Sequence, residues 1–257
     1  MQPSHDRSTA AGSPCRGFAW PCFSEYGGNE HEAAGDWPAA AGPLTRSAAP
    51  AYYLPVTGKP ATGRRRVRHE AAKEEILQAA WGLARSQGLA GFSLRDLAAV
   101  VGMRHQSLYT YFPSKQAIYE AMFAQGMGAL VDQRAGLDLP GDPVRALRQA
   151  ARAFLAFCVQ DPVRYQLLFE RVVPDFTPSA ASMELSRQAL GYLEAWLGAA
   201  GLTDGADVDF WRALLTGLAG QQLANDPGGL RWIGLADRAI DGLLSTARPP
   251  VHKASSI

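Results

Sequence analysis

Residues 93–115, SLRDLAAVVGMRHQSLYTYFPSK, contain the signals of two short helices joined by a tight turn. Ser93 followed three residues later by Asp96 fits a capping box, in which each side chain accepts a hydrogen bond from the other residue's backbone N–H. Gly102 lies between the two segments, where glycine adopts a positive φ without the steric cost of a Cβ atom. The stretch therefore predicts two short helices with a glycine turn between them.

A longer helix is expected before this pair. From His69 onward, apolar residues recur at the i, i+4, i+7 spacing of one buried helix face, and Gly88 ends the pattern. The second short helix is predicted over residues 104–111 and stops at Pro113. A longer helix followed by two short ones is typical of a helix-turn-helix unit, whose last helix enters the DNA major groove.

The second short helix begins with polar side chains that can touch base edges, namely Arg104, His105, Gln106 and Ser107. Arginine can bind guanine through two hydrogen bonds, and glutamine can bind adenine in the same way. Leu108 interrupts the polar run and is expected to hold the helix on its support. Three hydroxyl groups suited to phosphate oxygens follow, on Tyr109, Thr110 and Tyr111.

Charge is concentrated around this unit. Residues 64–115 hold nine basic and four acidic side chains, a local charge of +5 in a chain whose formal charge is +1. A local basic excess attracts phosphates. Arg64, Arg65, Arg66 and Arg68 precede the first predicted helix, either as an arm that binds DNA or as a charged, solvated linker. Both interpretations of this basic segment remain open.

Residues 76–119 resemble the N-terminal domain of the TetR family. The anchors of the resemblance are Ile76, Gly88, Phe92, Ser93, Leu94, Leu97, Val101, Gly102, Ser107, Leu108, Tyr109, Phe112, Lys115 and Ile118. Residues 108–115, LYTYFPSK, are similar to the family signature LYxHF..K, with Tyr111 in the place often held by histidine. The resemblance covers about fifty residues through several spaced anchors, so it is specific.

The resemblance implies roles for individual residues. Ser93 would contact a phosphate, and residues 104–107 would form the base-reading turn. Tyr109, Tyr111 and Lys115 would bind the DNA backbone. Lys115 could instead be a solvated surface lysine, although its place at a helix start opposes the helix dipole. These assignments complete the predicted DNA-binding set.

The rest of the chain is predicted to be helical, so the fold class is all-α. Helices are expected over residues 115–134, 179–200, 206–224 and 229–247, and at the Asp142-Pro143 and Asp161-Pro162 signals. We predict a helix-turn-helix domain over 63–115 and a helical ligand-binding and dimerisation domain over 116–248. Residues 1–62 are predicted to be disordered from their composition, and 249–257 to be a flexible tail. Val56 could mark an alternative start.

The region after residue 116 resembles, more loosely, the effector-binding and dimerising domain of TetR regulators. An apolar ligand pocket is therefore implied among Phe154, Phe157, Tyr165, Phe169, Met183, Tyr192, Trp196 and Trp211, with polar groups such as Arg152, Gln166 and Gln188. Each of these residues could instead fill the core.

Two further stripes could form a homodimer interface or close the monomer's own core. They are Trp211, Leu214, Leu215, Leu218 and Gln222, and Ile233, Ala236, Ile240, Leu243 and Leu244.

Several other classes of protein are disfavoured. Cys15, Cys22 and Cys158 are too few and too scattered for a disulfide framework or a metal site. No membrane span or secretory signal stands out, so a cytoplasmic location is expected. No catalytic motif is found, so neither an enzyme nor a cofactor is expected.

The sequence thus predicts a TetR-type repressor that a small molecule releases from a palindromic, double-stranded DNA operator. An architectural DNA-binding protein without a ligand switch is the alternative.

Overall fold

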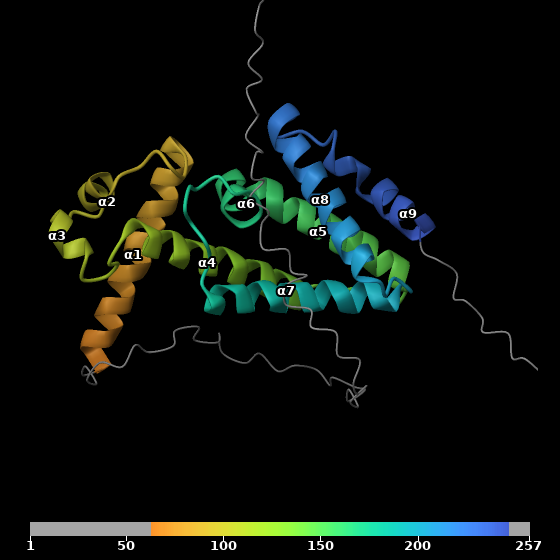
Figure 1. The fold of residues 1–257 in the computed structure, drawn as a ribbon, viewed down its shortest axis with the longest axis horizontal. Coiled ribbons are helices and arrows are strands. Elements are labelled where there is room, and N and C mark those ends of the chain that lie inside the picture. The colour runs from red at the N-terminus through yellow and green to blue at the C-terminus, as the bar shows by residue number, and fades with distance from the viewer. Residues whose placement is uncertain (1–62, 247–257) are drawn as a thin grey trace, which may run out of the picture. The chain divides into compact units, whose positions relative to one another are not determined.

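The computed structural model describes residues 63–246, and these fold into nine α-helices with no strand among them (Figure 1). The helices are α1 (Gly63–Gln87), α2 (Leu94–Val100), α3 (His105–Leu108), α4 (Lys115–Ala135), α5 (Pro143–Gln160), α6 (Pro162–Phe169), α7 (Ala180–Ala199), α8 (Gly205–Asn225) and α9 (Ala236–Thr246). The all-α prediction is confirmed. The predicted disordered segment 1–62, the predicted flexible tail 249–257, Val56, Cys15 and Cys22 lie outside the described residues.

Local capping signals fix where several helices begin. The Ser93 side chain accepts from the Asp96 N–H at 3.2 Å, and the Asp96 carboxylate accepts from the Ser93 N–H at 2.8 Å. Asp142 and Asp161 cap α5 and α6, each with proline at the first helical position. The predicted capping box and both Asp-Pro starts are confirmed.

Two glycines make the turns around α2 possible. Gly88, directly after α1, has φ +81°, and Gly102, between α2 and α3, has φ +66°. A side chain at either place would be strained in this left-handed region. The predicted helix stop at Gly88 and the predicted turn at Gly102 are confirmed.

Three predicted boundaries are wrong. α1 begins at Gly63 instead of His69, because its first turns are exposed and carry no apolar periodicity. α3 covers only His105–Leu108, since the chain turns at residues 109–111 before Pro113. The last predicted helix, 229–247, begins only at Ala236, after a short 3-10 turn over Ile233–Leu235.

Helices α1–α3 form a head, and α4–α9 form the body. The head is held by side chains that are almost fully buried, among them Ile76, Trp81, Phe92, Leu97 and Leu108. α4 starts beneath the head and continues into the body, so one continuous apolar core joins the two. Any reorientation of the head must therefore involve α4.

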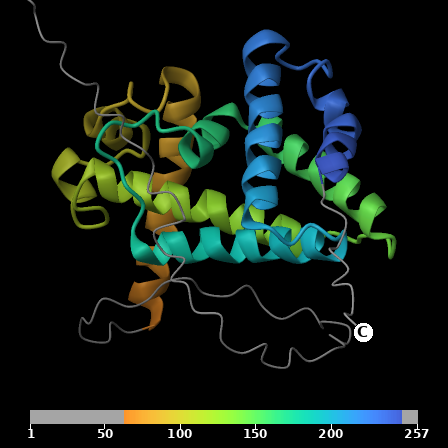
Figure 2. The same cartoon turned by 45° about the vertical axis from the view of Figure 1, so that its right-hand side comes forward.

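The body is built on two long helices that run in the same direction, α4 and α7 (Figures 1 and 2). Near their starts, Glu120 of α4 accepts from the Ser179 N–H at 3.0 Å and from the Ser182 hydroxyl at 2.5 Å. α5 packs against α8 and α9, and α6 contacts both α4 and α1. The head therefore meets the body through α4 and α6.

Candidate nucleic-acid interface

The short helix α3 presents a polar face and buries one apolar side chain. Leu108 is only 1% exposed and belongs to the continuous core, as the sequence predicted. Arg104, Gln106 and Ser107 are exposed, and His105 is half-buried with its ring at 5.3 Å from that of Tyr109. The polar side chains are thus accessible to a partner, because Leu108 alone anchors the helix to the core.

Tyr111 is placed by the first helix. Its ring stacks on His69 of α1, with the centroids 4.9 Å apart and the planes 29° from parallel. This contact has no signal in the sequence, because His69 lies in the second turn of α1, in the exposed part of the helix that carries no apolar periodicity. Tyr109 and Thr110 are exposed beside it. Three hydroxyl-bearing residues therefore follow α3 on the head.

Ser93 and Asp96 form a closed pair at the start of α2. The Ser93 hydroxyl donates to the Asp96 carboxylate at 2.6 Å in addition to the two capping bonds. Hydrogen bonds from Ser93 lower the pKa of Asp96, so this carboxylate is charged at neutral pH. The Ser93 side chain is exposed, but its hydroxyl is already bound, and its phosphate contact stays a prediction.

Lys115 has partners within the protein. Its ammonium donates to the carbonyls of Phe92 at 2.5 Å and Ala90 at 3.2 Å, and it lies 4.5 Å from the centre of the Phe92 ring. Burial lowers its pKa. These carbonyls explain how a cation is tolerated at the start of α4 without a bound phosphate. The predicted contact of Lys115 with the DNA backbone therefore stays a prediction.

The basic segment is helical. Arg65, Arg66 and Arg68 are exposed on the first two turns of α1, and Arg64 belongs to the same helix. The prediction that these residues precede the first helix is wrong, because the first turns of α1 are exposed and carry no apolar periodicity. They place positive charge at one end of α1, where it remains accessible to phosphates.

The predicted ligand-binding aromatics meet only in part. Phe154 of α5 lies 5.5 Å from Phe169 and 5.2 Å from Trp211, and Tyr165 lies 5.7 Å from Phe169, between ring centroids. The Tyr165 hydroxyl donates to the Thr216 carbonyl at 2.9 Å, so a body residue already satisfies it.

Among the described residues, the other predicted ligand residues make no ring contact with that four-ring group. Tyr192 and Trp196 pair on α7 with centroids 6.1 Å apart, and Met183 is half-buried on the same helix. Phe157 is buried with the Arg164 guanidinium 3.8 Å from its ring centre. Of the polar groups predicted for the lining, Arg152 is exposed and forms an ion pair with Asp237 of α9, Gln188 is exposed, and Gln166 is half-buried.

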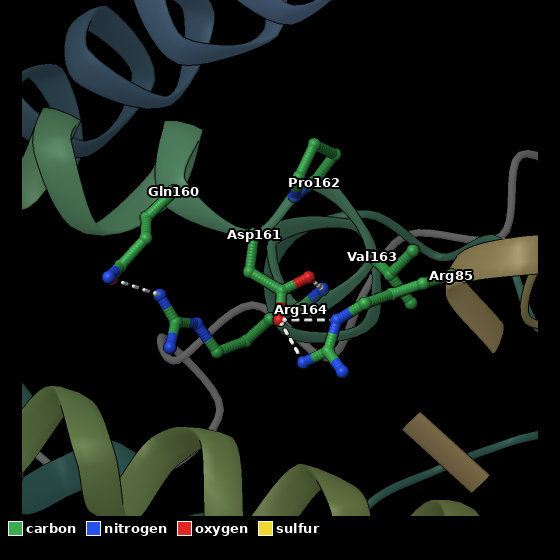
Figure 3. A pocket seen from close by; sticks show the side chains of 6 residues that line it. All are labelled: Arg85, Gln160, Asp161, Pro162, Val163 and Arg164. Carbon is green, nitrogen blue, oxygen red and sulfur yellow. Dashed lines mark hydrogen bonds and ion pairs between the residues drawn. The ribbon is translucent and has the colours of Figure 1, made fainter. Parts of the chain in front are cut away.

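A pocket of about 570 Å³ lies where α1 meets the start of α6 (Figure 3). Its lining residues are Arg85, Gln160, Asp161, Pro162, Val163 and Arg164. Arg85 Nη2 donates to the Asp161 carboxylate at 2.6 Å, which joins α1 of the head to the N-cap of α6. The sequence around Asp161 predicts only the cap, because nothing local identifies a partner 76 residues away.

The described part of the chain offers neither a metal-binding cluster nor a membrane span. Within residues 63–246, no group of three or more His, Cys, Asp or Glu side chains is placed to hold a metal ion. No helix in this range combines the length and apolar character that crossing a bilayer requires. Cys158 is a free, buried thiol.

Comparison with known proteins assigns the fold. Residues 76–122 match the family described as bacterial regulatory proteins, tetR family, and residues 147–247 match the tetracyclin repressor-like C-terminal domain. Together the two matches cover more than half of the 257 residues. No curated protein matches the chain in sequence.

Solved structures share this fold at low sequence identity. A protein designated SCO4313 is 22% identical, with a TM-score of 0.59 over 72% of this chain and all of that one. PfmR, a TetR family regulator from Thermus thermophilus, is 23% identical, with a TM-score of 0.52 over 68% of this chain and 99% of its own. FadR from Bacillus subtilis, crystallised with stearoyl-CoA, is 16% identical, with a TM-score of 0.54 over 67% of this chain and 97% of its own. With the head geometry and both family matches in agreement, the chain belongs to the TetR family of bacterial regulatory proteins.

Proposed function

We propose that this protein represses transcription by binding a palindromic DNA operator and leaves that operator when a small molecule binds the body. The observation that carries the proposal is the outward polar face of α3. Gln106 and Ser107 are exposed there, Arg104 stands at its start, and Leu108 fastens the helix to the head. A short helix held in this way can enter the major groove without unfolding any of its support.

The charge of the head supports binding to DNA. Nine basic side chains oppose four acidic ones between residues 64 and 115, and Arg65, Arg66 and Arg68 are exposed. One of the four acids, Asp96, is occupied in the capping box. Tyr109, Thr110 and Tyr111 carry hydroxyls beside α3 that fit phosphate oxygens. Phosphate contacts would position the head, and α3 would read bases.

A second copy of the chain would supply the other half of the operator contact. Three of the five residues in the apolar stripe considered for an interface on α8 are buried in the monomer's own core, namely Trp211, Leu215 and Gln222. The exposed face of α8 carries Phe210, Ala213, Gly217, Gln221 and Ala224 instead. Small residues at helical spacing with one exposed aromatic suit close helix packing, so we place the dimer contact on this face.

Release by a ligand would work through the contacts between head and body. α4 is shared by both, and the Arg85–Asp161 ion pair joins α1 to α6. A ligand that binds one arrangement of body helices better would shift the spacing of two heads and weaken operator binding. FadR of Bacillus subtilis, crystallised in complex with stearoyl-CoA, supports this step as a protein of similar fold that holds a small molecule.

The test is selection of binding sites from random duplex DNA by the purified full chain at one fixed salt concentration, since affinity depends steeply on salt. A regulator should enrich a two-fold symmetric site with half-sites one helical turn, about 34–36 Å, apart. An architectural DNA-binding protein would enrich no sequence or only bendable, A·T-rich duplexes. Failure to retain any duplex DNA at that salt concentration would refute DNA binding altogether.

A further inference from the structure

Arg134 is a charged side chain in the core of the body. It lies on α4 and is only 8% exposed. Met127, Leu130, Val131 and Arg134 occupy positions i, i+3, i+4 and i+7 of α4, so Arg134 continues the buried face of the helix. An arginine in that register points at the packed interior instead of solvent.

The surroundings of Arg134 do not neutralise it. One guanidinium nitrogen donates to the Ala189 carbonyl of α7, and the guanidinium carbon lies 5.8 Å from the Phe154 ring centre and 5.9 Å from that of Trp196. Within residues 63–246, no carboxylate lies within 4.0 Å of its nitrogens. The guanidinium therefore has aromatic faces and one carbonyl around it, but no counter-charge in the described part of the chain.

The unpaired charge is present at neutral pH. Burial lowers the pKa of Arg134 to about 10, and the positive charge of Arg212 acts in the same direction. A pKa of about 10 still leaves the side chain protonated at pH 7. Burying a charge without an ionic partner is costly, and folds retain such groups mainly where a ligand or a reaction uses them.

A buried hydrogen-bond donor without an acceptor lies beside the Phe154 ring. Trp211 of α8 is 1% exposed, and its indole N–H has no hydrogen-bond acceptor among the described residues. Its ring lies 5.2 Å from Phe154, the ring that Arg134 also faces. A buried indole N–H normally has an acceptor. A cation of α4 without a counter-charge and an indole N–H of α8 without an acceptor thus flank one ring of α5, and a ligand could supply both missing partners.

We propose that Arg134 binds the carboxylate of a small organic acid whose apolar part packs against Phe154, Trp196 and Trp211. One carboxylate neutralises one guanidinium, so a monocarboxylate matches the site in charge. The inference rests on the proposed function, because it names the chemical class of the effector. It also explains why two of the aromatics predicted for the pocket, Phe154 and Trp196, lie against a cation that was not among the predicted ligand residues.

The experiment compares acids with their uncharged amides in the absence of DNA. The probes are octanoate with octanamide and phenylacetate with phenylacetamide, measured by calorimetry and by tryptophan fluorescence on the full chain. At least one acid should bind at least about tenfold more tightly than its amide, because a hydrogen bond to a charged group contributes more free energy than a tenfold change in affinity requires. Equal binding of acid and amide, or no binding of either acid at about 1 mM, the weak end of the affinity scale, would overturn the proposal.

Two variants separate Arg134 from general charge. Arg134→Gln should reduce acid binding to the level of the amide, and Arg134→Lys should restore part of the difference. Arg187→Gln on α7 is the matched control, because Arg187 is exposed and paired with Glu184. Loss of the acid preference in the control as well would show that the preference does not come from Arg134.

The stability of the ligand-free protein gives an independent readout. If Arg134 is kept for a ligand, Arg134→Met removes an unpaired buried charge and should raise Tm by about 2–4 °C. A lower Tm would assign Arg134 a structural role at the Ala189 carbonyl and contradict the proposal. Operator selection is measured separately, so failure of the acids to bind leaves DNA binding standing, and failure of operator selection leaves acid binding standing.

Discussion

The ion pair between Arg85 and Asp161 should be a measurable link between head and body. Asp161 has two partners: its carboxylate accepts from Arg85 of α1 and from the Arg164 N–H, which it caps at 3.2 Å. Arg85→Gln removes the first partner and leaves the cap. Asp161→Asn removes the charge and keeps a residue that caps helices equally well. The two variants and their combination therefore form a clean double-mutant cycle.

The structure sets the size of the expected effect. The Asp161 side chain is 11% exposed, which strengthens the interaction, but that of Arg85 is 51% exposed, so solvent screens it. We therefore expect a coupling free energy of about 1 kcal/mol, at the upper end for exposed pairs. Each single variant should lower Tm by about 2–4 °C in a chain of this size.

Urea unfolding of the four proteins measures the coupling. Additivity of the two substitutions to within about 0.3 kcal/mol would refute the argument, because it would mean that the two side chains do not interact. A coupling near 1 kcal/mol that shrinks in high salt supports it.

The pH dependence of the same pair has a defined sign. Burial raises the pKa of Asp161, but the hydrogen bond from Arg85, the Arg164 N–H and the two positive charges outweigh it and leave the pKa lowered. Because the pKa of Asp161 is lower in the folded protein than in the unfolded chain, its charge stabilises the fold at pH values above the unfolded-state pKa of about 3.9. This stabilisation is lost as the pH falls through the folded-state pKa. The difference in unfolding free energy between wild type and Arg85→Gln should therefore be largest near neutral pH and should disappear below about pH 4. A constant difference down to the acid transition would contradict this assignment.

Three further outcomes follow from single side chains. Ser93→Ala should cost about 1 kcal/mol in urea unfolding, because it removes one half of the capping box; no loss would mean that the box contributes nothing. Leu108→Ala should cost about 2–5 kcal/mol and abolish operator binding, since this side chain alone anchors α3; unchanged binding would refute that role. Cys158 should resist iodoacetamide until the protein unfolds, because burial hides the thiol and raises its pKa; rapid labelling of the native chain would contradict its burial.

The parts of the fold that were predictable depend on local chemistry. The Ser93–Asp96 box, the glycine turn at Gly102 and the two Asp-Pro starts use residues within a few positions of one another, so the sequence contains the whole signal. The first turns of α1 escaped prediction because they are exposed, and periodicity reports only a buried face.

The parts that were missed depend on what packs opposite. The sequence predicts an apolar stripe on α8. Which face of α8 packs into the monomer's own core depends on α5 and α9, which contact it. The Arg85–Asp161 pair joins residues distant in sequence. Arg134 does carry a local signal, a charge at a buried helical register, yet its meaning needs Phe154 and Trp196 in place.

The most direct measurement of the central claim is the affinity of Gln106→Ala for the selected operator and for a scrambled duplex of equal length, at identical salt. Gln188→Ala is the control, because Gln188 is also exposed but lies on α7 of the body. If α3 reads bases, Gln106→Ala should lose about 10–100-fold on the operator and little on the scrambled duplex, and Gln188→Ala should match wild type. Equal losses on both duplexes, or no loss on the operator, would show that α3 does not read the sequence.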